Sequence, residues 1–231
     1  MPEGRVSIGM PELDQLIEGG LIENSTNLLA GQTGCGKTIF CCQYLLQGAL
    51  SGQNGVYLTL EEKSEDIVSD MNRFSWGSKF KQMIDNGSIV VQYQTPTDFN
   101  DLTDATLRAI RKNGAKRFVL DSLSIASMGW KVSSMDLGKV RSDIFSYMQA
   151  LKSANVTSLL ITEIPENGSK TLSRFGFEEF LVDGVINLHY LEYSATGTPR
   201  SLLIRKMRRT NHGTDIYPFV INENGIELKR R

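Results

Sequence analysis

Apolar and polar positions along the chain follow two periods, one typical of buried strands and the other of amphipathic helices. Short apolar runs at 27–30, 56–60, 89–91, 117–121 and 158–163 predict buried strands. Between them, apolar residues recur three and four positions apart, which predicts helices over 38–50, 64–74, 101–112 and 137–151. Strands that alternate with helices predict an α/β fold with a mostly parallel central sheet and helices on both faces.

Two of these helices carry more detailed predictions. Ser64 is expected to cap the helix that begins there, because a serine hydroxyl can accept from a free backbone N–H of the first turn. The helix near 137–151 is expected to bury a single apolar stripe. Its members are Leu137, Val140, Ile144, Met148 and Leu151.

The pattern changes after about Gly184. The stretches 184–194, 199–207 and 216–228 are rich in β-branched and apolar residues, and turn signals at 195–198 and 223–225 separate them. We interpret them as antiparallel strands that extend one edge of the sheet. No internal repeat or Pro/Ser-rich linker interrupts the sequence, so residues 1–231 are expected to form a single domain.

The first predicted strand runs into a glycine-rich turn, Gly31-Gln-Thr-Gly-Cys-Gly-Lys-Thr38, which fits G-x-x-x-x-G-K-[ST]. Glycines let backbone N–H groups point inward at phosphate oxygens, and the dipole of the following helix adds to the attraction. Lys37 supplies a cation for the β- and γ-phosphates, and the Thr38 hydroxyl can ligate Mg²⁺. The turn lies between a predicted strand and a predicted helix, so we expect a phosphate-binding loop (P-loop).

Composition and charge reduce the number of protein classes to which the chain could belong. The formal net charge is -1, which gives the whole chain no electrostatic reason to bind nucleic acid or an acidic membrane. No apolar run is long enough for a membrane span, and the N-terminus lacks the apolar core of a signal peptide, so a cytoplasmic protein is expected. The three cysteines are clustered and do not resemble a disulfide framework. Cys35, inside the loop, is interpreted as a packing residue, with an oxidation switch as the alternative.

Acidic residues at two strand ends are candidates for the other half of the site. Asp121 ends a buried strand and is expected to hold the Mg²⁺ shell, although a strand-ending Asp that merely starts a turn has the same pattern. Glu61 and Glu62 end the strand 56–60. They are either the start of a solvated helix or a base for hydrolysis, in which case mutual repulsion would raise the pKa of one of them.

The segment Arg205–Gly213 is the most basic part of the chain. Three interpretations fit: a solvated strand, a nucleic-acid patch, or cations that reach the γ-phosphate of a neighbouring subunit. Alternation along a strand would place Lys206, Arg208 and Thr210 on one face. Spacing alone favours the solvated strand.

Taken together, these motifs resemble the RecA-like P-loop ATPases of the KaiC type over nearly the whole chain. The resemblance rests on several stretches in the right order: MPELDQLIEGGL, the P-loop, YLTLEEKSEDI, RFVLDSLS, LLITEIPE, SRFGFEEFLVDGVI and IRKMRRTNHG. It implies ATP bound at the subunit interfaces of a hexameric ring. Thr33, Gly34, Cys35, Gly36, Lys37 and Thr38 would then bind the phosphates, with Mg²⁺ at Thr38 and Asp121.

The resemblance also implies roles beyond the P-loop. Glu61 and Glu62 would activate water, and Lys206 and Arg208 would act in trans on the γ-phosphate of the adjacent subunit. Further nucleotide contacts would come from Met207, Thr210, His212, Asn222 and Glu223. Two features depart from the family pattern: Arg209 stands where glycine is common, and no Ser or Thr occupies the autophosphorylated positions at Glu178–Phe180.

Four functions therefore remain open. The leading hypothesis is a Mg²⁺-dependent, homo-oligomeric ATPase that regulates an unidentified protein partner. The second is a recombinase-like DNA-binding module, which would need basic residues in the loop 165–177; nucleic acid is not the expected partner. The third is a scaffold that ATP closes without turnover. The fourth is an autokinase modified at Ser169, Thr171 or Ser173.

Overall fold

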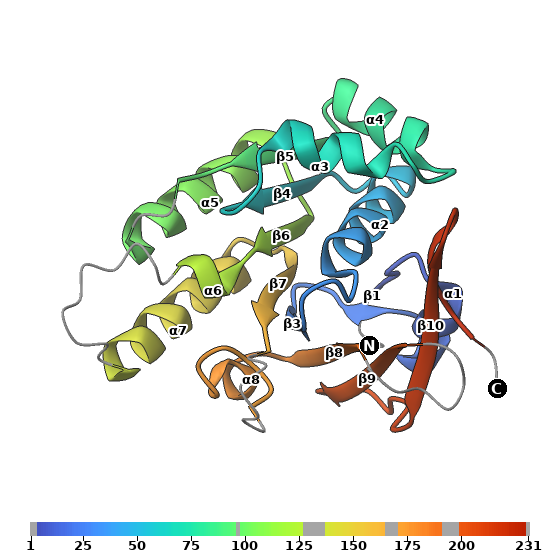
Figure 1. The fold of residues 1–231 in the computed structure, drawn as a ribbon. Coiled ribbons are helices and arrows are strands. Elements are labelled where there is room, and N and C mark those ends of the chain that lie inside the picture. Colours follow the sequence, from blue (N-terminus) through green and yellow to red (C-terminus); the bar gives the residue numbers. More distant parts are fainter. Residues whose placement is uncertain (1–3, 96–97, 127–136, 165–170, 191–198, 230–231) are drawn as a thin grey trace.

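The computed structural model describes residues 4–95, 98–126, 137–164, 171–190 and 199–229 (Figure 1). Its strands are β1 (Arg5–Val6), β2 (Leu21–Ile22), β3 (Thr26–Gly31), β4 (Gly55–Thr59), β5 (Ile89–Tyr93), β6 (Arg117–Asp121), β7 (Thr157–Glu163), β8 (Gly184–Tyr190), β9 (Arg200–Met207), β10 (Ile216–Asn222) and β11 (Gly225–Leu228). Its helices are α1 (Pro11–Leu16), α2 (Lys37–Leu50), α3 (Ser64–Met71), α4 (Gly77–Asp85), α5 (Phe99–Asn113), α6 (Leu123–Ala126), α7 (Leu137–Ser153) and α8 (Glu178–Leu181).

A large sheet forms the centre of the described structure, with the strand order β11-β10-β9-β8-β3-β7-β6-β4-β5. From β8 to β5 all neighbouring strands are parallel. At the other end, β9, β10 and β11 join by antiparallel pairing. The predicted mostly parallel sheet with antiparallel strands at the C-terminal edge is confirmed. One detail differs: β8 was expected to be antiparallel, but it pairs parallel to β3 and antiparallel only to β9.

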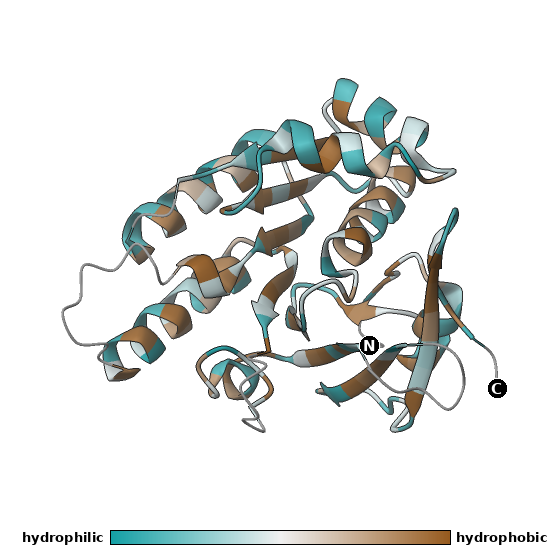
Figure 2. Ribbon diagram, in the orientation of Figure 1, coloured by the Kyte–Doolittle hydropathy of each residue, from teal (hydrophilic) through white to brown (hydrophobic). Residues whose placement is uncertain are grey.

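Helices cover both faces of this sheet (Figure 1). One apolar cluster packs α2, α3 and α4 against the sheet, and a second cluster packs α5, α6 and α7 against the opposite face. In Figure 2 the central strands are brown along most of their length, whereas the helices are brown on one side only. This is the expected pattern for strands buried on both faces and helices exposed on one.

Local signals placed most elements correctly, with two exceptions. Ser64 is the first helical residue of α3 rather than its cap; Lys63 precedes it, and no side chain caps that end. Leu137 is 53% exposed and does not belong to the buried stripe of α7, although the other four predicted members are buried. The turn predicted at 195–198 lies outside the described residues. The sequence did not predict β1, β2, α1, α4, α6 and α8.

A buried arginine joins α2 to the sheet. Arg117 on β6 is 2% exposed, and its guanidinium donates to the carbonyl oxygens of Ser7 and Tyr44 and to Oε1 of Gln53. It also stacks on the Tyr44 ring at 4.7 Å. Burial lowers the pKa of Arg117. Gly48 faces this side chain, and a Cβ there would lie 2.3 Å from Arg117 Cδ.

None of the helices within the described ranges has the length and apolar character needed to cross a membrane.

Candidate nucleotide-binding site

The parallel strands bring the predicted site residues to one edge of the sheet. The register aligns Gly31 at the end of β3 with Glu163 of β7, and Thr59 at the end of β4 with Asp121 of β6. In open α/β sheets, ligands bind at the carboxyl ends of the strands. The P-loop, the Glu61–Glu62 pair and Asp121 are therefore neighbours in space although they are distant in the sequence.

The P-loop has the backbone conformation that the glycine pattern predicts. Gly34 and Gly36 have φ angles of 72° and 99°, and Gly36 is the N-cap of α2. Only glycine adopts these angles without strain, so the loop can turn its N–H groups toward a ligand at the helix N-terminus. In this structure Lys37 Nζ donates to the carbonyl oxygens of Gly31 and Gln32, at 3.1 and 2.9 Å.

Cys35 is a packing residue in this loop. Its side chain is fully buried, and its Sγ donates to the Gln32 carbonyl oxygen at 2.8 Å. Burial raises the pKa of the Cys35 thiol, with a smaller opposing effect from Lys37. A buried, protonated thiol is poorly reactive, which favours the packing interpretation over the oxidation switch.

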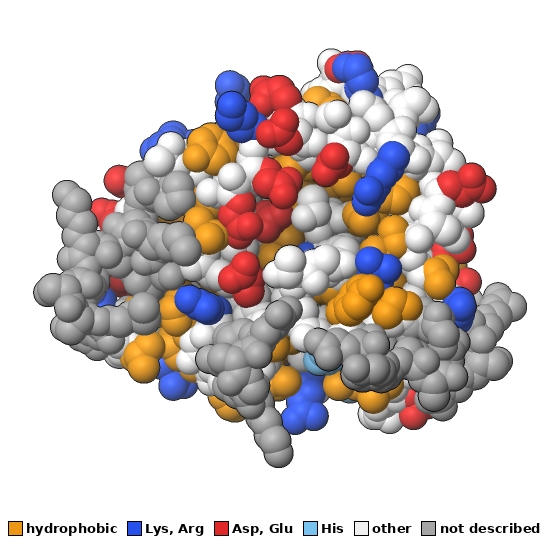
Figure 3. Space-filling model, in the orientation of Figure 1, with side chains coloured by type: hydrophobic (Ala, Val, Ile, Leu, Met, Phe, Trp, Pro, Cys, Tyr) orange, Lys and Arg blue, Asp and Glu red, His pale blue; other side chains and the backbone are white. Residues whose placement is uncertain are grey.

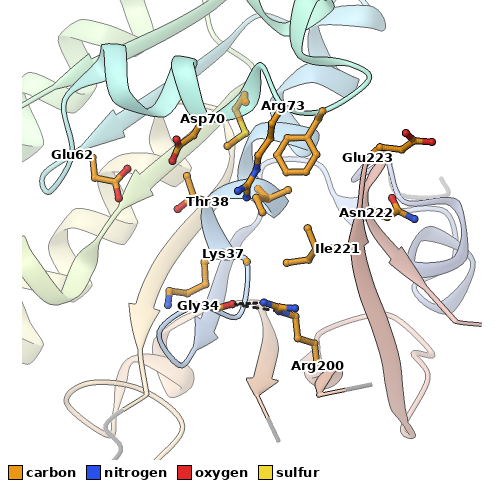
Figure 4. Close-up of a pocket in the computed structure, with 14 residues that line it drawn as sticks. Gly34, Lys37, Thr38, Glu62, Asp70, Arg73, Arg200, Ile221, Asn222 and Glu223 are labelled. Carbon is orange, nitrogen blue, oxygen red and sulfur yellow. Dashed lines mark hydrogen bonds between the residues drawn. The ribbon is translucent and has the colours of Figure 1, made fainter. Parts of the chain in front are cut away.

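A pocket of about 650 Å³ opens over the P-loop (Figure 4). It is lined by Gly34, Gly36, Lys37, Thr38, Ile39, Glu62, Asp70, Met71, Arg73, Phe74, Arg200, Ile221, Asn222 and Glu223. The volume is within the range of small-molecule and cofactor sites. Of the predicted site residues it contains Gly34, Gly36, Lys37, Thr38, Glu62, Asn222 and Glu223.

The end of the pocket away from Glu62 is flat and apolar. Phe74 and Ile221 of β10 both line this end, and the Arg73 guanidinium lies 4.9 Å from the Phe74 ring centre. Arg73 and Ile221 are labelled in Figure 4. Behind Phe74, the Trp76 ring stacks at 4.9 Å and 4°. Such surfaces suit the face of a purine ring. Asn222 and Glu223 line the outer part of this end, and the Glu223 carboxylate points away from its centre.

The wall at this end depends on a long-range contact that sequence reasoning did not predict. The backbone N–H of Ser75 donates to the Glu223 carbonyl oxygen at 2.8 Å, and Trp76 Nε1 donates to the Asn224 carbonyl oxygen at 3.0 Å. These bonds join the α3–α4 connection to the β10–β11 turn. No local signal in the sequence relates the two segments.

Arg200 is a further cation beside the loop that the sequence analysis missed. Its Nε and Nη2 donate to the Gly34 carbonyl oxygen at 3.3 and 3.2 Å (Figure 4), and its guanidinium lies 5.1 Å from the Tyr190 ring centre. Only its position at the start of β9, the strand that carries Lys206, could have drawn attention to it.

The two residues predicted to serve Mg²⁺ differ in their surroundings: Thr38 lines the pocket, whereas Asp121 ends β6 outside its lining. The carboxylate of Asp121 accepts from the Tyr57 hydroxyl, and burial raises the pKa of Asp121 to about 7. Repulsion from Glu61 acts in the same direction, whereas the Tyr57 bond and Lys37 oppose it. A buried carboxylate without a close cation is costly, and a divalent ion would relieve that cost. Carboxylate and hydroxyl oxygens, here from Asp121 and Thr38, are the donors that Mg²⁺ prefers.

The two candidate bases differ in their surroundings. Glu61 Oε1 accepts from the Ser122 hydroxyl at 2.6 Å, which fixes it beside Asp121. Glu62 lines the pocket, and its pKa is raised by partial burial first, then by Asp70 and Glu61. The expectation that repulsion would raise one pKa of the pair is confirmed in direction, although burial is the larger cause. Figure 3 shows acidic side chains gathered on this face, and the exposed members nearest the site are Glu61, Glu62, Glu65, Asp66 and Asp70.

Lys206 and Arg208 do not line the pocket of their own P-loop. Lys206 Nζ donates to the carbonyl oxygens of Glu179 and Val182, at 3.1 and 2.7 Å. Arg208 Nη1 lies 3.6 Å from Asp183 Oδ1, and its side chain is 50% exposed. Both cations therefore lie on the α8 side of the sheet edge. Partial burial lowers the pKa of Lys206, and the neighbouring Arg208 lowers it further.

The other residues predicted to contact the nucleotide each have separate surroundings. Strand β9 ends at Met207, so the expected alternation does not extend to Thr210; the Thr210 hydroxyl instead accepts from Arg5 at 2.8 Å. The Met207 side chain is 6% exposed and belongs to the core. Nδ1 of His212 lies 2.9 Å from the Gly213 carbonyl oxygen. Thr33 is exposed at the loop tip.

Comparisons with known proteins agree with this geometry. Residues 6–231 match the protein family described as "ATPase: KaiC". The chain belongs to the KaiC ATPase family. It is 31% identical to circadian clock protein KaiC2 of Synechocystis sp. (strain ATCC 27184 / PCC 6803 / Kazusa) in an alignment that covers 95% of this chain and 39% of that one. It is 32% identical to KaiC3 of the same organism, over 97% of this chain and 45% of that one. The chain thus spans less than half the length of these curated relatives.

A solved structure has the same extent as this chain. The KaiC-like protein PH0186 from the hyperthermophilic archaeon Pyrococcus horikoshii OT3 superposes with a TM-score of 0.86 at 36% identity, covering 99% of this chain and 100% of that one. The predicted RecA-like fold of the KaiC type is confirmed by these findings together with the sheet topology.

The structure describes the surroundings of the two features in which the sequence departs from the KaiC pattern. Arg209 has a φ angle of 55°, in the left-handed region that favours glycine. Ser173 is fully buried, and its hydroxyl lies 2.6 Å from carboxylate oxygens of both Glu178 and Glu179. A hydroxyl enclosed in this way is poorly placed to accept a phosphoryl group. Residues 165–170 of the loop considered for DNA, Ser169 among them, lie outside the described residues, and Thr171 is partly exposed.

Proposed function

We propose that the protein is a cytoplasmic, single-domain Mg²⁺-dependent ATPase that works as a homo-oligomeric ring with nucleotide at the subunit interfaces. Six subunits are the number that family resemblance favours. The P-loop backbone, Lys37 and Thr38 bind the phosphates. Thr38 and Asp121 hold Mg²⁺, which neutralises phosphate charge and orients the oxygens when bound.

We assign the chemistry at the γ-phosphate to residues of two adjacent subunits. Glu61, positioned by Ser122, and Glu62 orient water and accept its proton for in-line attack. The raised pKa of Glu62 suits a base that works near neutral pH. Charge that develops on the phosphoryl group is met by Lys37 of the same subunit and by Lys206 and Arg208 of the next.

One observation carries the proposal of a shared site: Lys206 and Arg208 lie at α8 and Asp183, outside the pocket that contains their own P-loop. Cations that serve the γ-phosphate must reach it directly. In this arrangement they can do so only at the P-loop of another copy.

Complementation between two inactive variants tests the shared site. Lys37→Ala subunits lack the phosphate lysine but still contribute Lys206 and Arg208. Arg208→Ala subunits retain the nucleotide-binding half but contribute no Arg208. Each variant alone should hydrolyse ATP at least about a hundredfold more slowly than the wild type, and mixtures should recover activity in proportion to the mixed interfaces.

The outcomes separate the alternatives. Failure of the mixture to recover, with both variants assembled, would exclude a site shared between subunits. A wild-type ring that assembles with ATP and never turns it over would instead favour the scaffold. Salt-sensitive affinity for single-stranded DNA would favour the recombinase-like module.

A regulatory output is the role we propose for this ATPase. Two of its relatives are named as circadian clock proteins, which act in timing. By that likeness, the nucleotide state of the ring would control binding of a protein partner. The test is to measure which proteins associate with rings held in ATP and in ADP, with Lys37→Ala as the reference.

A further inference from the structure

A buried carboxylate lies between the two halves of the proposed site. Glu178, the first residue of α8, is fully buried, and among the described residues its hydrogen-bond partners are neutral donors. They are the Ser173 hydroxyl at 2.6 Å, the Phe175 and Phe177 backbone N–H groups at 3.2 Å, and the Thr162 hydroxyl at 3.3 Å. Burying a carboxylate is costly, so such a cluster of donors indicates that the charge fixes this segment in one conformation.

The segment that Glu178 holds is the one that Lys206 contacts. Helix α8 has only four residues, and a single helical turn has little stability of its own. At its N-terminal side, the Glu178 carboxylate accepts from the preceding backbone N–H groups. At its C-terminal side, Lys206 Nζ donates to the Glu179 and Val182 carbonyl oxygens. The position of Lys206 therefore depends on backbone geometry that Glu178 imposes.

Glu178 is also connected to the nucleotide end of the same subunit. Thr162, its donor, lies beside Ala30 in the register of β7 with β3, one residue before the P-loop begins at Gly31. The Thr162 hydroxyl lies 3.4 Å from Ser124 Oγ, which accepts from the Glu163 backbone N–H at 3.0 Å. Side-chain hydrogen bonds thus run from the strand ends beside the P-loop to α8.

We propose that Glu178 is a positioning residue that sets the location of Lys206 for its action on the neighbouring subunit's nucleotide. This inference rests on the proposed shared ATPase site. Glu178 does not line the pocket over the P-loop. Its effect should therefore appear in the subunit that contributes the cations and be absent from the subunit that binds the nucleotide.

The substitution Glu178→Gln keeps the shape and removes the function of the carboxylate. The amide NH₂ group cannot accept, so one of the two acceptor positions is lost: the Oε1 position faces the Thr162 hydroxyl and the Phe175 N–H, and the Oε2 position faces the donors of Ser173, Phe175 and Phe177. Glu179→Gln is the matched control: it makes the same charge change at the next residue and leaves the carbonyl oxygen that Lys206 contacts. The Ser173 hydroxyl has one proton for the two carboxylates, and the amide that Glu179→Gln introduces can donate to Ser173, which leaves that proton for Glu178.

The complementation assay assigns the effect to one subunit. In the first mixture, Lys37→Ala/Glu178→Gln subunits are combined with Arg208→Ala subunits, so the substitution lies with the contributed cations. In the second, Lys37→Ala subunits are combined with Arg208→Ala/Glu178→Gln subunits, so it lies with the bound nucleotide. We expect kcat to fall about ten- to a hundredfold in the first mixture, with KM and the second mixture changed less than about twofold. Both Glu179→Gln mixtures should match the parental one.

Other results would overturn the inference. Equal losses in both mixtures would indicate a general structural role, and no loss in either would show that Lys206 is positioned without Glu178.

A second substitution tests whether Glu178 acts through Lys206. Adding Lys206→Ala to the first mixture should cause little further loss of kcat, since both changes remove the same contribution of Lys206. A full additional loss would contradict the assignment. If Glu178→Gln does not assemble, Thr162→Val, which removes one donor, is subject to the same comparison. Inactivity of the parental mixture would refute the shared site itself, a separate outcome.

Discussion

The pH dependence of folding stability tests how much the burial of Asp121, the proposed Mg²⁺ ligand, destabilises the fold. The ordinary pKa of this carboxyl group is 3.8, and burial raises it to about 7 in the folded protein. A buried carboxylate that stays protonated in the fold but ionises in the unfolded chain makes stability fall as pH rises between these two values. The substitution Asp121→Asn removes the ionisation and keeps an oxygen that can accept from Tyr57.

The size of the effect on stability follows from the difference of about three units between the two pKa values of Asp121. Each unit is worth about 1.4 kcal/mol, so the charged carboxylate destabilises the nucleotide-free fold by about 4 kcal/mol above pH 7. Below about pH 4 the group is protonated in both states and the cost vanishes. Between pH 5 and pH 8 the stability advantage of Asp121→Asn over the wild type should therefore grow by about 2 to 3 kcal/mol.

Urea denaturation in the presence of a chelator measures this difference. Free energies of unfolding of the wild type and Asp121→Asn are compared at pH 5, 6, 7 and 8, and the variant's advantage should increase with pH. Asp104→Asn, on the exposed side of α5, is the matched control for the loss of one carboxylate at the protein surface. An advantage for Asp121→Asn that stays constant, or shrinks, from pH 5 to pH 8 would refute the burial argument.

The same variant tests the metal assignment. Mg²⁺ and ATP should stabilise the wild type through binding to the folded state alone, whereas the Mg²⁺-dependent part of that stabilisation should be absent in Asp121→Asn. Retention of the full Mg²⁺ effect would place the ion on other ligands.

Three further substitutions test separate parts of the structure. Arg117→Lys should lower the free energy of unfolding by about 3 kcal/mol in urea, because one ammonium cannot satisfy the spread acceptors; a loss below about 0.5 kcal/mol would contradict this. Cys35→Ser should leave ATP affinity within about threefold in calorimetry, since packing needs only a small side chain; complete loss would indicate a chemical role. Phe74→Ala should weaken ATP binding about tenfold and remove the nucleotide-dependent change in Trp76 fluorescence; unchanged affinity would place the base elsewhere.

The strand–helix order and the P-loop could be predicted because their signals are local. The apolar run before Gly31 and the glycine spacing specify a strand, a turn and a helix within a short stretch of chain, and parallel pairing then brings Asp121 to the same edge. The chemistry of Glu61 and Glu62 was ambiguous from spacing, because an acidic pair after a strand also begins solvated helices. Only the Ser122 contact and the pocket wall distinguish the two interpretations.

Other parts of the site depend on contacts between distant segments. The flat end of the pocket exists because Ser75 and Trp76 bond to the β10–β11 turn, about 150 residues away. Leu137 fits the helical period of α7, yet it is exposed because nothing in the described structure covers the start of that helix. The period of a pattern specifies which residues share a face, and tertiary packing decides how far along the helix that face is covered.

In this structure, the cations beside the P-loop and those assigned to the γ-phosphate are each bonded within their own subunit. Lys37 and Arg200 donate to P-loop carbonyl oxygens, Lys206 donates to α8, and Arg208 pairs with Asp183. A triphosphate must therefore exchange carbonyl acceptors for charged phosphate oxygens, which accept stronger hydrogen bonds. In the proposed shared site, the exchange at Lys37 and Arg200 needs one subunit only, whereas that at Lys206 and Arg208 needs a neighbour. Nucleotide binding by a single subunit and turnover by an assembled pair are thus separable steps, and binding should persist at dilutions that abolish hydrolysis.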